Sequence, residues 1–419
     1  MEITIQKYGG TSLATDEQVH TIADRAASAH GRGRSLVVVV SARGGTTDEL
    51  IEAAGALTAD PCPGETDKLL ATGEVAAAAM MAISLQGRGV PAVSLTGPQA
   101  GLRAAGRHGA GVVTEIDPAP VRDWLERDHV VVVAGFQALT PAGDVITLGR
   151  GGSDTSAVAL AAAHDARACE VYTDVDGVHR ADPRVVEGAP ILPRVEARVM
   201  AEMAVSGARV MHARAVELAA TYGLDVGIGN AAGGGTATTI VGRREPMHEA
   251  GPPPTTLGER PRVVAITHET AVVQTIVRAG ARLTGPAVLD ALADGQISVD
   301  AVASWPSTAE DLHLAFCAPA SQLPAVRDVL GPLLEQHGGA VEAREPCGRV
   351  SIVGTGLLSR PGLTAGAIAE LARYGIPADC VSCTSTRTSL LVPVERVRDA
   401  VVILYGLFEL DREPVLAPA

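Results

Sequence analysis

Three turns rich in glycine carry the residues of this chain that could do chemistry. The first is Lys7-Tyr8-Gly9-Gly10, which directly follows an alternating apolar segment. Glycine lets backbone N–H groups approach an anion closely, and a lysine beside them supplies a mobile positive charge for a phosphate. Lys7 and Lys68 are the only lysines among 34 Lys and Arg residues, so we expect Lys7 to fill a role that arginine cannot. A plain tight turn is the alternative.

The second turn is Gly149-Arg150-Gly151-Gly152-Ser153-Asp154, and an alanine-rich stretch that predicts a helix over 155–164 follows it. Ser153 or Asp154 could cap that helix. The free N–H groups at a helix N-terminus favour a carboxylate or a phosphate, and Arg150 can hold a carboxylate through two parallel hydrogen bonds. The turn is therefore a candidate anion site, with a simple capped turn as the alternative.

The third turn is Thr173-Asp174-Val175-Asp176-Gly177, with Ala181-Asp182-Pro183-Arg184 shortly after it. Its Asp-x-Asp-Gly pattern is shared with calcium loops, but those loops end on a bidentate glutamate. The corresponding residue here is Val185, which excludes calcium. A loop that contacts a nucleotide after the end of a strand is the interpretation that remains.

Other common chemistries lack their motifs in this chain. There is no GxxxxGK[ST], no GxGxxG opening the first helix, no HExxH and no GxSxG. The eleven histidines are scattered without the spacing of metal ligands. These absences argue against P-loop enzymes, dinucleotide-binding proteins, zinc proteases and α/β-hydrolases.

Hydrophobic patterning predicts alternating strands and helices between residues 3 and 230. Strands are predicted at 3–8, 36–40, 92–95, 130–134 and 169–172. A helical pattern covers 16–29, and Thr46-x-x-Glu49 predicts a capping box that opens another helix. This α/β alternation implies a mainly parallel sheet with helices on both faces.

Composition limits the partners and the compartment. The 419 residues allow two or three domains, and a net charge of -14 argues against nucleic acid or an anionic membrane as partner. The strand-like apolar runs are too short to cross a bilayer, and the segment MEITIQKYGG lacks the pattern of a signal peptide. Six cysteines do not form a disulfide framework, so we expect a reducing cytoplasm.

The pattern changes after a linker rich in proline and glycine at 246–262. Beyond it, two successive βαββαβ patterns predict a pair of ferredoxin-like modules at 263–345 and 346–419. Strands are expected near 272–277, 297–303, 312–317 and 340–343, and helices near 284–294, 321–337, 363–374 and 394–408. Cys380 and Cys383 fall in a strand-like stretch, where they point to opposite faces, so we expect no metal or redox role for them.

Taken together, these turns resemble the aspartate kinase family. KYGGTS, SARGGTTDEL, Gly73-Glu74, AGFQ, TLGRGGSDT, YTDVDGV and ADPRVV occur in the order and spacing typical of that family. The similarity covers nearly the whole chain and is closest to the actinobacterial type with two C-terminal ACT modules. It implies an amino-acid-kinase fold over 1–245, and transfer of the γ-phosphoryl group of ATP, with Mg²⁺, to the side-chain carboxylate of L-aspartate. This is the first step of aspartate-family amino-acid biosynthesis.

The resemblance also implies roles for individual residues. Those expected at ATP are Lys7, Tyr8, Gly9, Gly10, Ser41, Thr173, Asp174, His179, Asp182, Arg184 and Arg209. Those expected at aspartate are Thr47, Glu74, Phe136, Arg150, Gly151, Gly152 and Ser153. Arg150 would hold the α-carboxylate and Glu74 the α-ammonium. Asp154 would organise Lys7 and the Mg²⁺-bound phosphate, and no protein side chain is assigned as a metal ligand.

The chemistry of this reaction fits such a set. A carboxylate nucleophile has an ordinary pKa of about 3.9 and is ionised at neutral pH, so no general base is required. The obstacle is repulsion between two anions, which is about 4 kcal/mol per pair of unit charges at 4 Å and an effective dielectric of 20. Lys7, Mg²⁺ and the glycine-loop amides are expected to offset it.

Four departures from the family pattern are visible. Arg209 stands where the family usually has a lysine, and His179 where it commonly has a tyrosine; we expect activity to survive, with weaker ATP affinity. In the first ACT module the effector loop is 280–283, and only Asp300 matches the family's effector strand. We therefore expect weak or absent inhibition by lysine plus threonine. The second module keeps its loop at 359–362.

The sequence leaves three interpretations of the function and one prediction of the assembly. Aspartate kinase is the preferred reading, a related kinase acting on another small carboxylate or carbamate is the second, and a non-catalytic amino-acid sensor is the third. Exposed ACT sheet edges predict a homo-oligomer. An internal start at Met247 would produce a separate regulatory chain.

Overall fold

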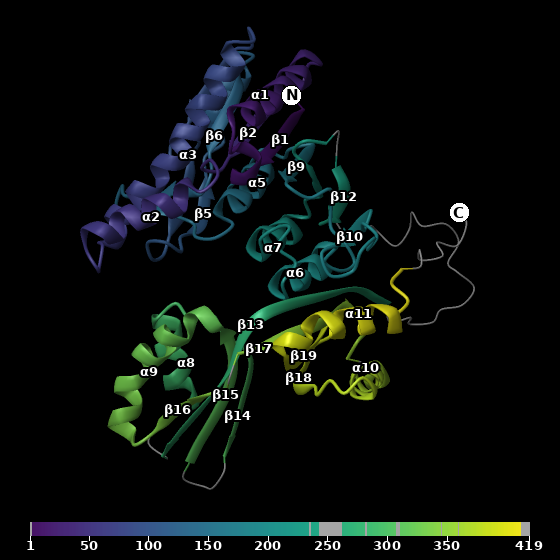
Figure 1. Ribbon diagram of the computed structural model, residues 1–419. Helices are drawn as coiled ribbons and strands as arrows, with labels where there is room; N and C mark the ends of the chain where they lie inside the picture. The colour runs from purple at the N-terminus through teal and green to yellow at the C-terminus, as the bar shows by residue number, and fades with distance from the viewer. Residues whose placement is uncertain are drawn as a thin grey trace. The chain divides into compact units, whose positions relative to one another are not determined.

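The computed structural model describes residues 2–233, 236–242, 262–280, 283–306, 311–344, 346–358 and 360–411. The chain divides into two compact units, drawn as a ribbon in Figure 1. The first comprises Met1–His179 and Ile191–Pro254, and the second Arg180–Pro190 and Thr255–Ala419. The predicted linker lies outside the described residues apart from Arg262.

The first unit is built on an eight-stranded sheet with the order β10-β12-β11-β9-β1-β2-β6-β3. Its strands are β1 (Ile3–Tyr8), β2 (Ser35–Val40), β3 (Ala92–Leu95), β6 (Val130–Ala134), β9 (Ala168–Thr173), β10 (Arg194–Glu196), β11 (Val226–Asn230) and β12 (Thr236–Val241). All neighbours pair in parallel except β11 and β12. The predicted strands and the mainly parallel sheet are confirmed.

Helices cover this sheet on both faces. They are α1 (Asp16–Gly31), α2 (Thr46–Leu57), α3 (Pro63–Gln86), α4 (Ala119–Leu125), α5 (Gly152–Ala163), α6 (Ala197–Val205), α7 (Ala213–Tyr222) and the short 3₁₀ helix η1 (Gly10–Leu13). Tyr8 packs into one core with α1 and α3. Successive strand residues point to opposite faces, so Lys7 points to the other face, where it meets α5.

Helix α3 is, among the described residues, the one helix long and apolar enough to cross a membrane by length and hydropathy. The prediction from short apolar strands did not consider it. Half of its most apolar window is buried, and it packs against β3, β6 and β8. It also carries two buried carboxylates, Asp67 and Glu74. These are the properties of a core helix.

Two predicted helix caps are wrong. Helix α2 begins at Thr46 itself, its N-cap is Gly45 and no side chain caps it, so Thr46 and Glu49 form no capping box. A capping box occurs instead at Thr15 and Gln18, where α1 begins. Helix α5 starts at Gly152, three residues earlier than predicted, and its N-cap is Gly151 at φ +67°. Neither Ser153 nor Asp154 caps it, because both lie inside its first turn.

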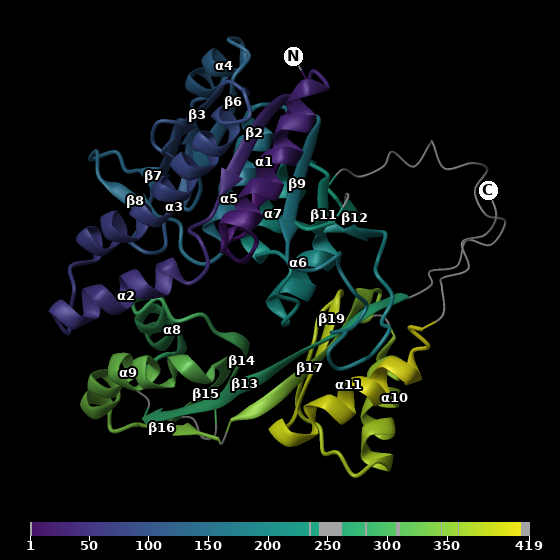
Figure 2. The same cartoon turned by 45° about the horizontal axis from the view of Figure 1, so that its top comes forward.

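A small second sheet of the first unit leads into the Arg150 turn. Its order is β5-β4-β7-β8, with β4 (Leu102–Ala105), β5 (Val112–Ile116), β7 (Gln137–Leu139) and β8 (Val145–Thr147). Four residues, 148–151, separate the end of strand β8 from the start of α5. Figure 2 shows β7 and β8 beside α3. The turn is therefore held between a short strand and a buried helix.

The second unit contains one seven-stranded sheet, in which β14-β15-β13-β17-β19-β18 are consecutive and β16 also pairs with β13. Its strands are β13 (Arg262–Gly280), β14 (Asp300–Pro306), β15 (Asp311–Pro319), β16 (Ala340–Ala343), β17 (Cys347–Thr355), β18 (Asp379–Cys383) and β19 (Arg387–Pro393). Its helices are α8 (Gly285–Asp294), α9 (Leu323–His337), α10 (Pro361–Arg373) and α11 (Val397–Leu407). The predicted helices are confirmed, within three residues at their ends.

Strand β13 links the two predicted modules in a way that the sequence pattern did not anticipate. Residues 262–272 of β13 pair with β17, whereas 272–280 pair with β15 and 275–278 with β16. The second βαββαβ pattern therefore does not supply all of its own strands, because one comes from the start of the first predicted module, ahead of the strand expected near 272–277. The segment 180–190 also joins this unit, where Ala181 and Ala189 pack into the core beneath α10 and α11.

Candidate active site

The site begins with an ion pair between β1 and α5. Lys7 Nζ lies 2.5 Å from Asp154 Oδ1, with side-chain exposures of 9% and 11%. The other oxygen of Asp154 accepts a hydrogen bond from the backbone N–H of His212 at 3.4 Å. Burial makes an isolated charge costly, so each partner requires the other. A lysine held in this way keeps two further N–H donors for a ligand.

Glycines allow the loops around this pair to approach closely. A Cβ on Gly10 would lie 2.5 Å from the carbonyl oxygen of Ala42, and one on Gly73 would lie 2.9 Å from Ala42 Cβ. The backbone N–H of Gly44 donates to Gly10 O at 3.0 Å. The turns after β1 and β2 are therefore packed against each other and against α3.

Glu74 is a buried carboxylate with an unused hydrogen-bond acceptor in the described chain. It is 4% exposed; its Oε1 accepts from the backbone N–H of Ala42 at 3.1 Å, and its Oε2 is buried without a partner in the described chain. Burial raises the pKa of Glu74 to about 7. Such an oxygen is suited to a cationic ligand group, because a charge-assisted hydrogen bond would complete its coordination.

The predicted aspartate residues Phe136 and Ser153 lie together. Ser41 Oγ and Ser153 Oγ are 2.8 Å apart, and a Cβ on Gly135 would lie 2.8 Å from Ser153 Cβ. Phe136 has φ +72°, an uncommon conformation for a residue with a side chain. Its N–H donates to Ser156 Oγ at 3.1 Å, which helps to hold that backbone.

Gly151 and Gly152 are required by close packing. A Cβ on Gly151 would lie 2.2 Å from His212 Cβ, and one on Gly152 would lie 2.9 Å from a ring carbon of Phe136. Arg150, next to them, is exposed, and no ion pair or hydrogen bond involves its side chain among the residues described. Thr47 is half-buried in the first turn of α2. The geometry thus leaves Arg150 free for a ligand.

The predicted nucleotide residues fall into two groups. Thr173 ends β9, and its hydroxyl accepts from the N–H of Val175 at 3.0 Å. Asp174 and Arg209 are exposed, and His179 is half-buried. Asp182 and Arg184 belong to the second unit, where they pair with each other at 2.8 Å. The hydrogen bond from Arg184 lowers the pKa of Asp182. The structure therefore does not place those two residues relative to Lys7.

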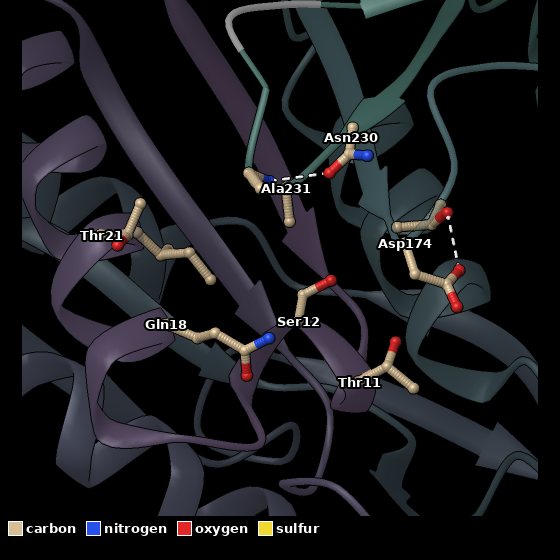
Figure 3. Close-up of a pocket in the computed structure, with 10 residues that line it drawn as sticks. Thr11, Ser12, Gln18, Thr21, Asp174, Asn230 and Ala231 are labelled. Carbon is tan, nitrogen blue, oxygen red and sulfur yellow. Dashed lines mark hydrogen bonds between the residues drawn. The ribbon is translucent and has the colours of Figure 1, made fainter.

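A pocket opens beside the end of β9 on the α1 side of the sheet. Figure 3 shows its polar side chains, which come from η1, α1, β9 and the end of β11. The lining residues are Thr11, Ser12, Gln18, Thr21, Ile22, Thr173, Asp174, Asn230, Ala231 and Ala232. Stacked rings of Tyr8 and Tyr172, 5.1 Å apart, lie nearby within the sheet.

Sequence reasoning missed three residues that support the site: Asp67, His212 and Arg214. Asp67 lies seven residues before Glu74 on α3 and is 2% exposed. A carboxylate at that spacing shares a face with Glu74, and this was the signal available. Nothing local marked His212 or Arg214, whose partners are distant in sequence. No group of three or more His, Cys, Asp or Glu residues that could hold a metal occurs in the described parts of the chain.

The second unit contains a different charge cluster, in which the half-buried Asp300 pairs with two buried arginines. Its Oδ2 accepts from Arg349 at 2.6 Å, its Oδ1 accepts from Arg387 at 3.0 Å, and the N–H of Ala301 adds a third bond at 2.7 Å. Burial acts to raise its pKa, but Arg387, the Ala301 amide and Arg349 together hold it below its ordinary value. The predicted effector residue is thus already neutralised. Ala281, Arg282, Ser359 and Met247 lie outside the described residues.

Comparison with known proteins adds the family. The model of the amino acid kinase family matches residues 2–230, and an ACT domain model matches 342–406. The chain is 36% identical to an aspartokinase of Mycolicibacterium smegmatis over 99% of both chains. It is 37% identical to an aspartokinase of Geobacillus stearothermophilus, over 99% of this chain and 98% of that one.

Solved structures agree on the fold. The aspartate kinase from Synechocystis superposes with a TM-score of 0.74 at 24% identity, covering 99% of this chain and 100% of that one. E. coli aspartokinase III, solved with aspartate and ADP, gives 0.74 at 23% identity, over 97% and 99%.

Proposed function

This chain belongs to the aspartokinases of the amino acid kinase family, and on that premise we propose that it transfers the γ-phosphoryl group of Mg²⁺-ATP to the side-chain carboxylate of L-aspartate. The observation that carries the proposal is the buried Lys7–Asp154 pair, at 2.5 Å, in the same unit as a buried glutamate whose second oxygen has no partner among the residues that the structure describes. A cation for phosphate and an anion for an α-ammonium are what this reaction requires.

The chain's own residues have separate tasks in this proposal. Lys7 and the N–H group of Gly10 neutralise the phosphates, so that the carboxylate of aspartate can approach in line. The N–H of Gly9 donates to the carbonyl oxygen of Tyr172 at 3.3 Å, so Gly9 contributes close approach of the backbone rather than a donor. Asp154 orients the Lys7 ammonium. Glu74 binds the α-ammonium, and Arg150, which is exposed and has no partner in the described parts of the chain, binds the α-carboxylate. Mg²⁺ enters with ATP as part of the substrate and shields the charge of its phosphates.

We further propose that Ser41, Thr173, Asp174, His179 and Arg209 contact the nucleotide, with Asp182 and Arg184 supplied by the segment 180–190. Residues 1–245 would form the catalytic part, with the regulatory modules at 263–345 and 346–419. We expect Arg209→Lys to lower the Michaelis constant for ATP, because an ammonium reaches a phosphate as a compact charge. An unchanged constant would make this departure from the family neutral.

The test of the main proposal is an ATP- and aspartate-dependent hydroxamate assay on purified protein. Lys7→Ala should lower kcat by about 100-fold or more, because a preorganised cation acts mainly in the transition state. Lys68→Ala is the matched control, since Lys68 is exposed and pairs with Glu65 within one helix turn. Near-wild-type turnover in Lys7→Ala would remove the assigned role.

A substrate panel separates the alternatives. Turnover with aspartate but not with glutamate or other small acids supports aspartate kinase. Turnover restricted to another acid supports a related carboxylate or carbamate kinase. No turnover with any acid, together with amino-acid binding, supports a sensor without catalysis.

We also propose weak feedback control. The support is that Asp300, the one residue matching the family's effector strand, is occupied by Arg349 and Arg387. An effector ammonium would have to displace two guanidinium groups. Millimolar lysine plus threonine should therefore leave turnover nearly unchanged, and strong inhibition would overturn the proposal.

The assembly and the compartment of the protein are also proposals. We expect a cytoplasmic homo-oligomer formed through the regulatory modules, with a separate regulatory chain started at Met247 if internal initiation occurs. Analytical ultracentrifugation tests the homo-oligomer, and gel electrophoresis of natively expressed protein tests the internal start. A single full-length band would count against the internal start.

A further inference from the structure

We propose that Asp67 and Arg214 are positioning residues for the loop that carries Arg150: an anion on α3 and a cation on α7 bind the opposite polar groups of the same two loops. The inference rests on the proposed function, in which Arg150 binds the α-carboxylate of aspartate. The two loops are 108–111, which leads into β5, and 147–151, which joins β8 to α5.

Asp67 binds only hydrogen-bond donors of these loops. Its carboxylate accepts from the backbone N–H of Thr147 at 2.9 Å and from the Thr147 hydroxyl at 2.6 Å. The N–H of Gly109 lies 3.1 Å from both of its oxygens, and His108 Nδ1 lies 2.8 Å from Oδ2. The side chain is 2% exposed. An amide in its place would present N–H to N–H at one of these contacts.

Arg214 binds only acceptors of the same loops. Its Nη1 donates to the carbonyl oxygen of Leu148 at 2.7 Å, and its Nη2 donates to that of Gly111 at 2.8 Å. The loops are also joined directly, because the N–H of Gly111 donates to Thr147 O at 2.9 Å. One planar guanidinium therefore spans both loops from α7, while one carboxylate spans both from α3.

The segment held in this way has little rigidity of its own. Gly149 and Gly151 both adopt positive φ, at +75° and +67°, and glycine has many alternative conformations. Arg150 stands between them without a partner of its own in the described chain. Its position is therefore set by the backbone on either side: Thr147 and Leu148 before it, and Gly151, covered by His212, after it.

The same helix start also contacts the catalytic pair. The N–H of His212 donates to Asp154 at 3.4 Å, two residues before Arg214. Helix α7 therefore holds the Arg150 loop and the Asp154 carboxylate together. We call Asp67 and Arg214 together the clamp. Loss of either residue should misplace Arg150 more than Lys7, because Lys7 is anchored in the central sheet by β1.

Steady-state kinetics on the full chain test the clamp. Asp67→Asn and Arg214→Met should each raise the Michaelis constant for aspartate by about 10- to 100-fold, since small misplacements of positioning groups have effects of this order. The constant for ATP should change by less than about threefold. Arg214→Lys should raise the Michaelis constant for aspartate less than Arg214→Met does, because an ammonium can still bind one carbonyl oxygen. It should not reach the wild-type value, because one ammonium cannot reach both carbonyls in the same geometry. Asp123→Asn and Arg32→Met, both exposed, are the matched controls.

A double-variant cycle separates positioning from general stability. If Asp67 and Arg214 act through Arg150, then Asp67→Asn or Arg214→Met added to Arg150→Met should change the aspartate constant by less than about twofold. Full additivity would overturn the proposal. The proposal would also be overturned if both single variants kept the wild-type melting temperature and the wild-type Michaelis constant for aspartate. If Asp67→Asn does not fold, Arg214→Met and Thr147→Val carry the same test.

Failure of the proposed function gives a different result. If Arg150→Met alone leaves the aspartate constant unchanged, the role of Arg150 is wrong, whatever the clamp does. If Arg150→Met raises it and the clamp variants do not, the function stands and the clamp is wrong.

Discussion

Two carboxylates, the buried Glu74 in the first unit and the half-buried Asp300 in the second, differ in how far their surroundings satisfy them with hydrogen bonds and counter-ions. Glu74 accepts a hydrogen bond from the amide of Ala42; among the described residues no charged neighbour shifts its pKa, and its second oxygen has no partner. Asp300 has two arginines and an amide. A buried charge left incomplete in the free protein can be completed by a ligand, whereas a completed one contributes to structure. The comparison assigns Glu74 to binding and Asp300 to stability.

Removing the charge of Asp300 should produce the largest effect. Asp300→Asn leaves Arg349 and Arg387, whose side chains are 9% and 6% exposed, without their shared anion. We expect the free energy of unfolding to fall by about 3 kcal/mol, as when one partner of a buried pair is removed. Urea denaturation measures it. Glu370→Gln is the control, because its pair with the exposed Arg373 should contribute less than about 1 kcal/mol. Equal losses in the two variants would contradict the comparison.

The same exchange at Glu74 should act on binding instead. Glu74→Gln keeps an oxygen for the N–H of Ala42 but loses the anion for the α-ammonium. We expect the Michaelis constant for aspartate to rise about 30-fold, corresponding to about 2 kcal/mol for a charged hydrogen bond. The free energy of unfolding should not fall, because no cation of the described chain pairs with Glu74. A Glu74→Gln protein that unfolds early but binds aspartate normally would reverse the assignment.

The pH dependence of aspartate binding should report on the same group. With a pKa of about 7 in the free protein, Glu74 is mostly protonated at pH 6 and mostly ionised at pH 8. The Michaelis constant for aspartate should therefore fall about tenfold over this range, and Glu74→Gln should remove that slope. The effect of pH on folding has the opposite sign. The raised pKa stabilises the fold fully below about pH 4.5, and this contribution is lost as pH rises through 7.

His164 tests whether every unsatisfied buried group marks a ligand site. Both ring nitrogens lack a partner in the described chain, and the ring is 3% exposed. Burial, with a smaller effect of Arg122, lowers its pKa to about 4, so the ring is neutral at pH 7. We interpret it as a packing residue, because a neutral ring can remain buried without a counter-ion.

His164 should therefore affect only the free energy of unfolding in acid, and this should be the smallest of the predicted effects. The unfolded chain binds more protons between pH 6.5 and about 4, so stability is full above pH 6.5 and declines as pH falls. Between pH 7 and 5.5 we expect a loss of about 1 kcal/mol that His164→Leu removes, measured by urea denaturation at both pH values. A His164→Leu protein with altered aspartate kinetics would show that the comparison is too simple.

Local signals in the sequence predicted most of the elements. Five of the eight strands of the main sheet, helix α1 and the helices of the second unit follow apolar periodicity, which depends on burial of one face and is readable locally. The capping predictions at Thr46 and at Ser153 were wrong because the backbone turns at Gly45 and Gly151 serve as N-caps there. The division of β13 between two sets of partners was not predictable either, since one continuous strand carries no signal of where its neighbours change.

The sequence by itself determined the three glycine turns and the family, because these depend on residue type and order. Only the tertiary structure decided that Lys7 meets Asp154, that Asp67 and Arg214 hold one loop from two helices, and that Asp300 is paired with Arg349 and Arg387. The physical reason is that a charge in the interior is defined by its partners. Those partners come from distant segments whose meeting is set by strand order rather than by local propensity.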